Sequence, residues 1–320
     1  MTRSGVTKIR DFLGPYRLSR LIRAGQTSQV WEAHNDKTSE RFALKVLKPD
    51  LRKDRRELGY LKHEFEVAKD LNHPNIIKLH EFCTQYQTPF LVLELYSALN
   101  LKQVLREGPE HIAHLTEKIV HQSSHALQYF HTKGWIHCDL KPDNLLVNEE
   151  GNVKLIDFTI SQKPKPNLLR FLGIKSTIRG TRSYMSPEQI RGKTLDGRSD
   201  VYSFGCVVFE LLTGKPPYTG STPNELLSRH LNASIPSPVM HNSNVTRDFS
   251  DLLRRMMAKV PAARPASMWE VLQECKKIRI FNKRPTPPAK ALSEIETKTI
   301  TDIDDLKNVS KKKTQKPEEE

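Results

Sequence analysis

His137-Cys138-Asp139-Leu140-Lys141-Pro142-Asp143-Asn144 is the stretch of this sequence that decides the fold. It places the carboxylate of Asp139 two residues before Lys141 and five residues before Asn144, and the apolar run Leu145-Leu146-Val147 follows. This pattern predicts a loop between a helix and a short strand, with its polar groups held in place. His, Asp and Asn also stabilise turns and helix ends, so each residue alone has a purely structural interpretation. The whole set in this order indicates a loop that carries chemistry.

The stretch resembles the catalytic loop of eukaryotic-type (Hanks-type) Ser/Thr protein kinases, which reads H-R-D-x-x-x-x-N in that family. His137 and Asp139 match the motif, Lys141 is typical of the Ser/Thr branch, and Cys138 stands where the family usually has Arg. The resemblance implies that Asp139 accepts or orients the proton of the substrate hydroxyl and that Lys141 steadies the transferring phosphoryl group. It also implies that Asn144 is a metal ligand.

The residues before this loop favour a small antiparallel sheet. Three short β-rich runs predict a meander: 16–18, 29–33 and 42–47. The first hairpin loop lies where kinases have the Gly-rich loop GxGxxGxV that covers the ATP phosphates, but only Gly25 and Val30 match. Arg23 and Ser28 replace the first and third glycines, so the backbone should approach the phosphates less freely.

The strand segment Phe42-Ala43-Leu44-Lys45 resembles the V-A-I-K strand of kinases. The resemblance implies that Lys45 holds the α- and β-phosphates and that Ala43 helps to roof the adenine. A helical pattern over residues 57–72 supplies a partner for Lys45, and two glutamates compete for that role. Glu64 lies nine residues before His73, as in the family, and Glu66 cannot share its helix face, so Glu64 is favoured.

The run from Phe90 to Tyr96 predicts a buried strand that leads into a connector resembling the kinase hinge. The resemblance implies that Leu93 is the gatekeeper and that backbone groups of Glu94 and Tyr96 bond the adenine edge. It also counts Leu146 among the ATP-binding residues.

The run 153–159 predicts a strand that ends in Asp-Phe, and it resembles the D-F-G motif with Thr159 in place of Gly. The resemblance implies that Asp157 and Asn144 hold Mg2+, with Mn2+ as an alternative. A β-branched Thr stiffens the backbone where Gly permits a flip, so inward–outward switching of this loop should be restricted.

Residues 160–185 resemble the activation segment, and Ser186-Pro187-Glu188 resembles the A-P-E motif that ends it. Six cationic residues in this segment indicate either a docking surface for acidic or phosphorylated substrates or a solvated loop: Lys163, Lys165, Arg170, Lys175, Arg179 and Arg182. Ser176 and Thr177 are candidate autophosphorylation sites, and Thr181 is expected to bond near Asp139. Because Cys138 replaces the Arg that pairs with an activation-loop phosphate, this means of control should be missing.

Two further residues are expected to support the catalytic loop rather than to act in catalysis. Asp200 would bond the backbone of that loop, and Arg264 would pair with Glu188. Asp200 opens the apolar run 201–212, which is short and contains Glu210, so it predicts a buried helix and not a membrane span.

Metal and disulfide chemistry is not indicated elsewhere. Five histidines, at positions 111, 114, 121, 125 and 131, have no nearby carboxylate or Cys to complete a ligand set, so they are expected on the surface or in packing. The four cysteines are too widely spaced for a CxxC-type metal site and too few for a disulfide scaffold, so reduced thiols are expected. Residues 1–10 lack the apolar core of a secretory signal, which favours a cytoplasmic location.

Composition is that of a soluble globular protein, with 37% apolar and 28% charged residues. The net charge of +14 favours phosphorylated, acidic or polyanionic partners, or serves solubility alone, and both interpretations stay open. A specific nucleic-acid binder is not indicated, because no RRM, KH or zinc-finger pattern is present.

The resemblance covers residues 16 to about 280 and implies an α+β, bilobal protein-kinase-like fold. The expected lobes are a small antiparallel N-lobe with one helix (16–93), a hinge (94–97) and a larger, mainly helical C-lobe (98–280). A basic extension (1–15) precedes them and a disordered charged tail (281–320) follows. Threonines beside acids in the tail, at positions 297, 299 and 301, form either an autophosphorylated segment for a phosphothreonine-reading module or part of a plain linker.

The implied function is a non-specific Ser/Thr protein kinase that transfers the γ-phosphoryl group of ATP to a protein hydroxyl. The alternative is a pseudokinase, an ATP-binding scaffold or regulator. It rests on four departures from family motifs, at Arg23, Ser28, Cys138 and Thr159. Against it, every charged residue of the chemistry is present.

Overall fold

The structure is a computed structural model that describes residues 12–164 and 180–288. The candidate phosphorylation sites Ser176 and Thr177, the threonine cluster of the tail and most of the cationic run lie outside the described residues.

An antiparallel six-stranded sheet forms the first part of the chain, in the order β1-β2-β3-β4-β6-β5. Its strands are β1 (Phe12–Leu13), β2 (Tyr16–Ala24), β3 (Ser28–Asn35), β4 (Arg41–Leu47), β5 (Leu79–Gln85) and β6 (Thr88–Glu94). The predicted meander is therefore present, with a longer first strand than expected. Strand β1 pairs with β2 and buries Leu13, so the end of the predicted N-terminal extension belongs to the sheet.

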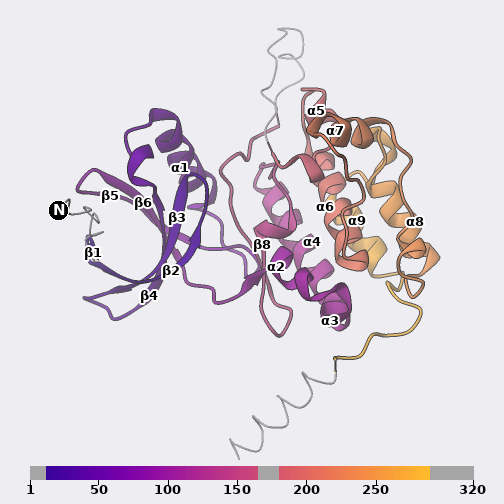
Figure 1. The fold of residues 1–320 in the computed structure, drawn as a ribbon, viewed down its shortest axis with the longest axis horizontal. Coiled ribbons are helices and arrows are strands. Elements are labelled where there is room, and N and C mark those ends of the chain that lie inside the picture. The colour runs from indigo at the N-terminus through magenta and orange to yellow at the C-terminus, as the bar shows by residue number, and fades with distance from the viewer. Residues whose placement is uncertain (1–11, 165–179, 289–320) are drawn as a thin grey trace, which may run out of the picture.

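Helix α1 (Arg55–Ala68) packs against β5 and β6, as Figure 1 shows. The carboxylate of Asp54 accepts hydrogen bonds from the backbone N–H groups of Arg56 and Glu57, which fixes the start of the helix. The helix ends four residues earlier than the predicted limit at 72, and Leu71 is buried in the loop that follows. An apolar residue one turn beyond a helix end can fill the same core without being helical, which explains the difference.

The second part of the chain is mainly helical and occupies the other side of Figure 1. Its helices are α2 (Leu101–Val104), α3 (Pro109–Ile112), α4 (Thr116–Thr132), α5 (Pro187–Ile190), α6 (Gly197–Thr213), α7 (Pro223–Asn232), α8 (Arg247–Met256) and α9 (Met268–Cys275). A small antiparallel sheet lies beside them, formed by β7 (Leu99–Asn100), β8 (Leu145–Val147) and β9 (Val153–Leu155). The predicted strand 153–159 thus ends at Leu155, and Asp157 adopts a left-handed backbone conformation (φ 68°) that cannot continue a strand.

Helix α6 is buried from Ser199 to Leu212, which confirms the predicted buried helix. Glu210, one of the two buried acids of this helix, is paired with Lys102 (2.5 Å) and with the hydroxyl of Tyr184 (2.6 Å), so its charge is not left alone in the core. Among the described helices, none has both the length and the apolar character needed to cross a membrane.

The predicted α+β class with a small β lobe and a larger helical lobe is confirmed. Ile280 and Phe281 are buried, and Phe281 pairs with Val245 as an isolated bridge. The packed chain therefore continues at least one residue past the predicted boundary at 280.

Candidate active site

A cavity of about 960 Å³ lies between the six-stranded sheet and the start of the helical lobe. Its apolar walls come from both parts of the fold and include the predicted ATP-binding residues Val30, Ala43 and Leu146, together with Leu93 and Ile77. Gly25, Lys45, Glu64, Glu94, Tyr96, Asp139, Lys141 and Asp157 also line it. A concave pocket of this size, apolar with a few convergent charges, suits a nucleotide-sized ligand.

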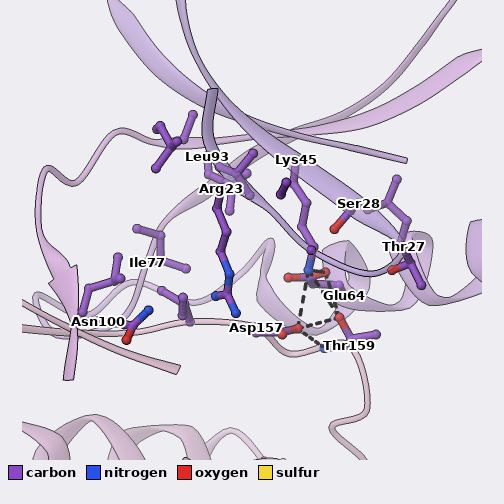
Figure 2. Close-up of a pocket in the computed structure, with 18 of the residues that line it drawn as sticks. Arg23, Thr27, Ser28, Lys45, Glu64, Ile77, Leu93, Asn100, Asp157 and Thr159 are labelled. Carbon is purple, nitrogen blue, oxygen red and sulfur yellow. Dashed lines mark hydrogen bonds and ion pairs between the residues drawn. The ribbon is translucent and has the colours of Figure 1, made fainter. Parts of the chain in front are cut away.

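Four polar side chains meet at one end of the cavity, as Figure 2 shows. Lys45 Nζ lies 2.6 Å from Glu64 Oε2 and 3.4 Å from Asp157 Oδ1. Thr159 Oγ1 lies 2.6 Å from the same Asp157 oxygen and 3.1 Å from Glu64 Oε2. Glu64 is buried on α1 whereas Glu66 is exposed, so the structure brings Glu64, and not its rival, to Lys45.

The charges of this group act on one another's pKa values: burial and the nearby charge of Asp157 raise the pKa of Glu64, while Lys45 opposes that shift. Burial alone would lower the pKa of Lys45, but the carboxylates of Asp157 and Glu64 outweigh it and raise the pKa above its usual value. Burial alone would raise the pKa of Asp157, but Lys45 and the Thr159 hydroxyl outweigh it and hold the pKa well below its usual range. Lys45 is therefore cationic and Asp157 anionic at neutral pH.

The predicted catalytic pair is assembled beside this group. Lys141 Nζ lies 2.6 Å from Asp139 Oδ2 and donates to the Thr181 hydroxyl at 2.8 Å. Thr181 donates its backbone N–H (2.8 Å) and its hydroxyl (3.0 Å) to Asp139 Oδ1. Both oxygens of Asp139 are thus oriented, and Thr181 lies where the resemblance implied.

The backbone of the catalytic loop is anchored to helix α6. Asp200 accepts hydrogen bonds from the N–H groups of His137 (2.7 Å) and Cys138 (3.0 Å) and from His131 Nε2 (2.8 Å). Burial would raise the pKa of Asp200, but the contacts with His131 and His137 together outweigh it and lower the pKa. Cys138 itself has a left-handed φ of 67°, and burial raises the pKa of its thiol well above the usual value, which makes it unreactive.

The residues expected to hold a metal ion fit that role. Asn144 is fully buried, its Nδ2 donates to the carbonyl oxygen of Asp139 (2.8 Å), and its Oδ1 has no hydrogen-bond partner among the described residues. Carboxylate and amide oxygens are the ligands that Mg2+ prefers, usually together with substrate phosphates. Within residues 12–164 and 180–288, no cluster of three or more His, Cys, Asp or Glu could hold a metal by itself. A divalent cation between Asn144 and Asp157 would therefore depend on further oxygens, such as those of a nucleotide.

The predicted pair of Glu188 and Arg264 is present and buried. Arg264 Nη1 and Nη2 bond the two Glu188 oxygens at 2.7 and 2.8 Å, and the hydroxyl of Ser199 donates to Glu188 at 2.7 Å. Burial would raise the pKa of Glu188, but the bonds and charge of Arg264, together with the bond from Ser199, outweigh it and lower the pKa. The contact joins α5, α6 and the segment before α9.

At the hinge, the backbone N–H of Glu94 already donates to the carbonyl of Lys78 (2.9 Å), so this N–H is not available to a ligand. The Glu94 side chain bonds Lys154 Nζ at 2.6 Å. The hydroxyl of Tyr96 donates to the carbonyl of Asn152 (3.1 Å), which holds the connector against the small sheet.

Sequence reasoning missed several residues that support the loop. Gln189 Nε2 donates to the carbonyl of Cys138 (2.8 Å), and His63 Nε2 lies 2.7 Å from the carbonyl oxygen of Ser161. His131, which was expected on the surface or in packing, is the side-chain partner of Asp200. These partners come from distant parts of the chain and belong to no contiguous motif, so the sequence carried no signal for them.

The four cysteines are all free, as predicted.

Comparison with known proteins agrees with this geometry. The sequence model of the protein kinase domain matches residues 16–276. The serine/threonine-protein kinase PknB of Mycobacterium tuberculosis is 30% identical over 291 residues, which are 89% of this chain and 46% of that protein. The probable serine/threonine-protein kinase PknB of Bifidobacterium longum is 29% identical over 255 residues, 77% of this chain and 37% of the relative. The chain spans less than half the length of these curated relatives. The match over most of the chain and the assembled lysine, glutamate and aspartates of the cavity together establish that the chain belongs to the protein kinase family.

Proposed function

We propose that this chain is a Mg2+-dependent Ser/Thr protein kinase that transfers the γ-phosphoryl group of ATP to a serine or threonine hydroxyl of a protein. The observation that carries the proposal is the orientation of Asp139 by Lys141 and Thr181 at the mouth of a nucleotide-sized cavity. The names of the relatives support the same reaction class.

Each charged residue has a distinct role in the proposed mechanism. The carboxylate of Asp139 accepts or orients the hydroxyl proton of the protein substrate, and Lys141 neutralises charge on the transferring phosphoryl group. Lys45, held by Glu64, binds the nucleotide phosphates. These residues position the reactants and stabilise charge, which is the main requirement of phosphoryl transfer.

Asn144 and Asp157 would hold the divalent cation, with Mn2+ as an alternative to Mg2+. The cation supplies neutralisation of phosphate charge when it is bound. Asp157 stays anionic at neutral pH because its pKa is lowered, so it is ready to bind a cation without losing a proton first.

The arrangement also favours activity without a phosphate on the activation segment. Cys138 replaces the Arg that pairs with an activation-segment phosphate in the family. Hydrogen bonds between uncharged groups hold the catalytic loop and the start of the activation segment together instead. Gln162 and Ile136 exchange backbone hydrogen bonds at 2.8 and 2.9 Å, and Gln189 bonds the carbonyl of Cys138. We place control of this chain outside the usual Arg–phosphate pair.

The pseudokinase alternative lacks a supporting observation. Of the four departures from family motifs, the Thr159 hydroxyl bonds Asp157, and Cys138 keeps the loop anchored through its backbone. Neither departure separates Lys45 from Glu64 or Asp139 from Lys141.

Substrates and location follow from the same proposal. Protein substrates with acidic or phosphorylated segments complement the net charge of +14, and a phosphothreonine-reading module at the tail and a cytoplasmic location remain proposals.

Asp139→Asn provides the test, with Asp70→Asn on the exposed loop after α1 as a control for the same charge change. With labelled ATP, Mg2+ and a generic basic protein, Asp139→Asn should lose phosphate transfer, while both variants keep the parental affinity for ATP. Transfer by Asp139→Asn at the parental rate would refute the role of Asp139. Absence of transfer by the parental protein, with ATP still bound, would favour the pseudokinase.

A further inference from the structure

Arg23 is a cation of the cavity to which the mechanism above assigns no role. It is the penultimate residue of β2, its side chain is exposed, and it lines the cavity. Figure 2 shows the side chain extending from the sheet into the pocket. None of the described residues forms a hydrogen bond or ion pair with its guanidinium group, so its donors are free for a ligand.

Strand register explains why Arg23 faces the cavity. Arg23 pairs with Val30 across β2 and β3, and Val30 pairs with Lys45 across β3 and β4. Residues directly opposite one another in antiparallel strands project from the same face of a sheet. A register shift between Leu21 and Arg23 adjusts the alternation of β2, as β-bulges do beside active sites.

The cross-strand pairing of Arg23, Val30 and Lys45 also sets the distance between the two cations, Arg23 and Lys45. Neighbouring strands lie roughly 5 Å apart, so the backbones of Arg23 and Lys45 are separated by about 10 Å across the roof of the cavity. Long side chains from two such positions can reach different atoms of one polyphosphate chain.

The loop between β2 and β3 offers less backbone to phosphates than a Gly-rich loop does. The N–H of Gly25 donates to the carbonyl of Ser28 (2.8 Å), and the carbonyl of Thr27 accepts from the N–H of Lys48 (2.9 Å). A Cβ atom at Gly25 would approach the Ser28 oxygen to 3.2 Å, which shows how closely the turn is folded on itself. Gly25 is the glycine of the Gly-rich motif that this chain retains. Its backbone N–H is already bonded to Ser28 and is therefore not available to a phosphate.

Arg23 differs from Lys45 and Lys141 because its charge is not shared with a carboxylate. Lys45 is paired with Glu64 and Asp157, and Lys141 is paired with Asp139. A guanidinium group presents several N–H donors in a planar fork that matches two phosphate oxygens at once.

We infer that Arg23 binds a phosphate group of the nucleotide and takes over contacts that the missing glycines would make in a Gly-rich loop. The inference rests on the proposed function, since it requires a nucleotide in this cavity. The side chain acts as a binding residue for the polyphosphate and leaves the adenine contacts to the apolar walls.

The test compares the affinities of adenosine, AMP, ADP and ATP, with Mg2+, for the parental chain and for Arg23→Met by titration calorimetry. A hydrogen bond to a charged group is worth enough to predict a loss of at least about tenfold in ATP affinity. Adenosine affinity should stay unchanged, and the nucleotide at which the loss first appears identifies the phosphate that is bound. Arg23→Lys should recover part of the loss, because a lysine keeps the charge without the fork.

Arg17→Met is the matched control, because it removes the same charge from the same strand away from the cavity. Its exposed pair with Asp36 spans 3.6 Å, so little stability depends on it. Equal loss for adenosine and ATP in Arg23→Met, or no loss for ATP, would overturn the inference alone. A parental chain that binds none of the four compounds would overturn the proposed function as well.

Discussion

Thr159→Val tests whether the hydroxyl that replaces the glycine of the D-F-G motif positions Asp157. The hydroxyl lies 2.6 Å from Asp157 Oδ1, 3.1 Å from Glu64 Oε2 and 3.4 Å from Lys45 Nζ. A hydroxyl has one hydrogen to donate, and the shortest contact indicates that it goes to Asp157. Valine keeps the β-branched shape and removes the hydroxyl, which donates to Asp157 and accepts the longer bond from Lys45.

The expected magnitude follows from the partner and its exposure. Hydrogen bonds to charged groups contribute about 1.5–3 kcal/mol. The side chain of Asp157 is 35% exposed and keeps its contact with Lys45, so the lower end applies. Because about 1.4 kcal/mol corresponds to a factor of ten in rate, kcat/KM for ATP should fall about tenfold.

The assay measures steady-state phosphorylation of a generic protein substrate over a range of Mg2+ concentrations. Thr159→Val should need more Mg2+ for half-maximal rate, since Asp157 is less well oriented to bind it. Thr159→Ser keeps the hydroxyl and should stay close to the parent in both measures. Parental kcat/KM and Mg2+ dependence in Thr159→Val, with unchanged thermal stability, would refute the positioning role.

Three further predictions follow from the structure. Glu64→Gln should reduce kcat/KM by more than tenfold, because it removes the charged partner of Lys45. Glu66→Gln on the exposed side of α1 should leave kcat/KM unchanged. Equal effects of the two variants in the phosphorylation assay would contradict the assignment of Glu64 as the partner of Lys45. Glu188→Gln breaks a buried ion pair and should cost roughly 3–5 kcal/mol at pH 7, measured by denaturant unfolding. The pKa of Glu188 is lowered in the folded state, so its stabilisation is present above the ordinary pKa of Glu and is lost as the pH falls through the folded-state value. The stabilities of the variant and the parent should therefore converge in acid. A difference in stability that persists in acid would argue against the ion pair. Treatment of the purified chain with a protein phosphatase, followed by its removal, should leave the initial rate within about twofold, because Cys138 cannot pair with an activation-segment phosphate; a loss of activity that returns with ATP would contradict control outside that pair.

Local pattern was sufficient to predict most of the fold. The β-rich runs, the amphipathic helix that carries Glu64 and the apolar run of α6 each follow from side-chain periodicity, which depends only on neighbouring residues. Element ends were less well predicted. The strand before Asp157 stops at Leu155, and Asp157 adopts a left-handed backbone conformation that the apolar pattern of this run does not predict.

By itself, the sequence determined which residues we propose for the chemistry, because Asp139, Lys141, Asn144, Lys45 and Asp157 occur at spacings that one loop and two strands impose. Only the tertiary structure decided how the departures from the family pattern are used. It directs Arg23 into the cavity through strand register and brings the Thr159 hydroxyl to Asp157. It also supplies distant partners, such as Gln189 at the carbonyl of Cys138. The physical reason is that hydrogen bonds and charge pairs depend on distances of about 3 Å between atoms, and residues far apart in a chain reach such distances only after it has folded.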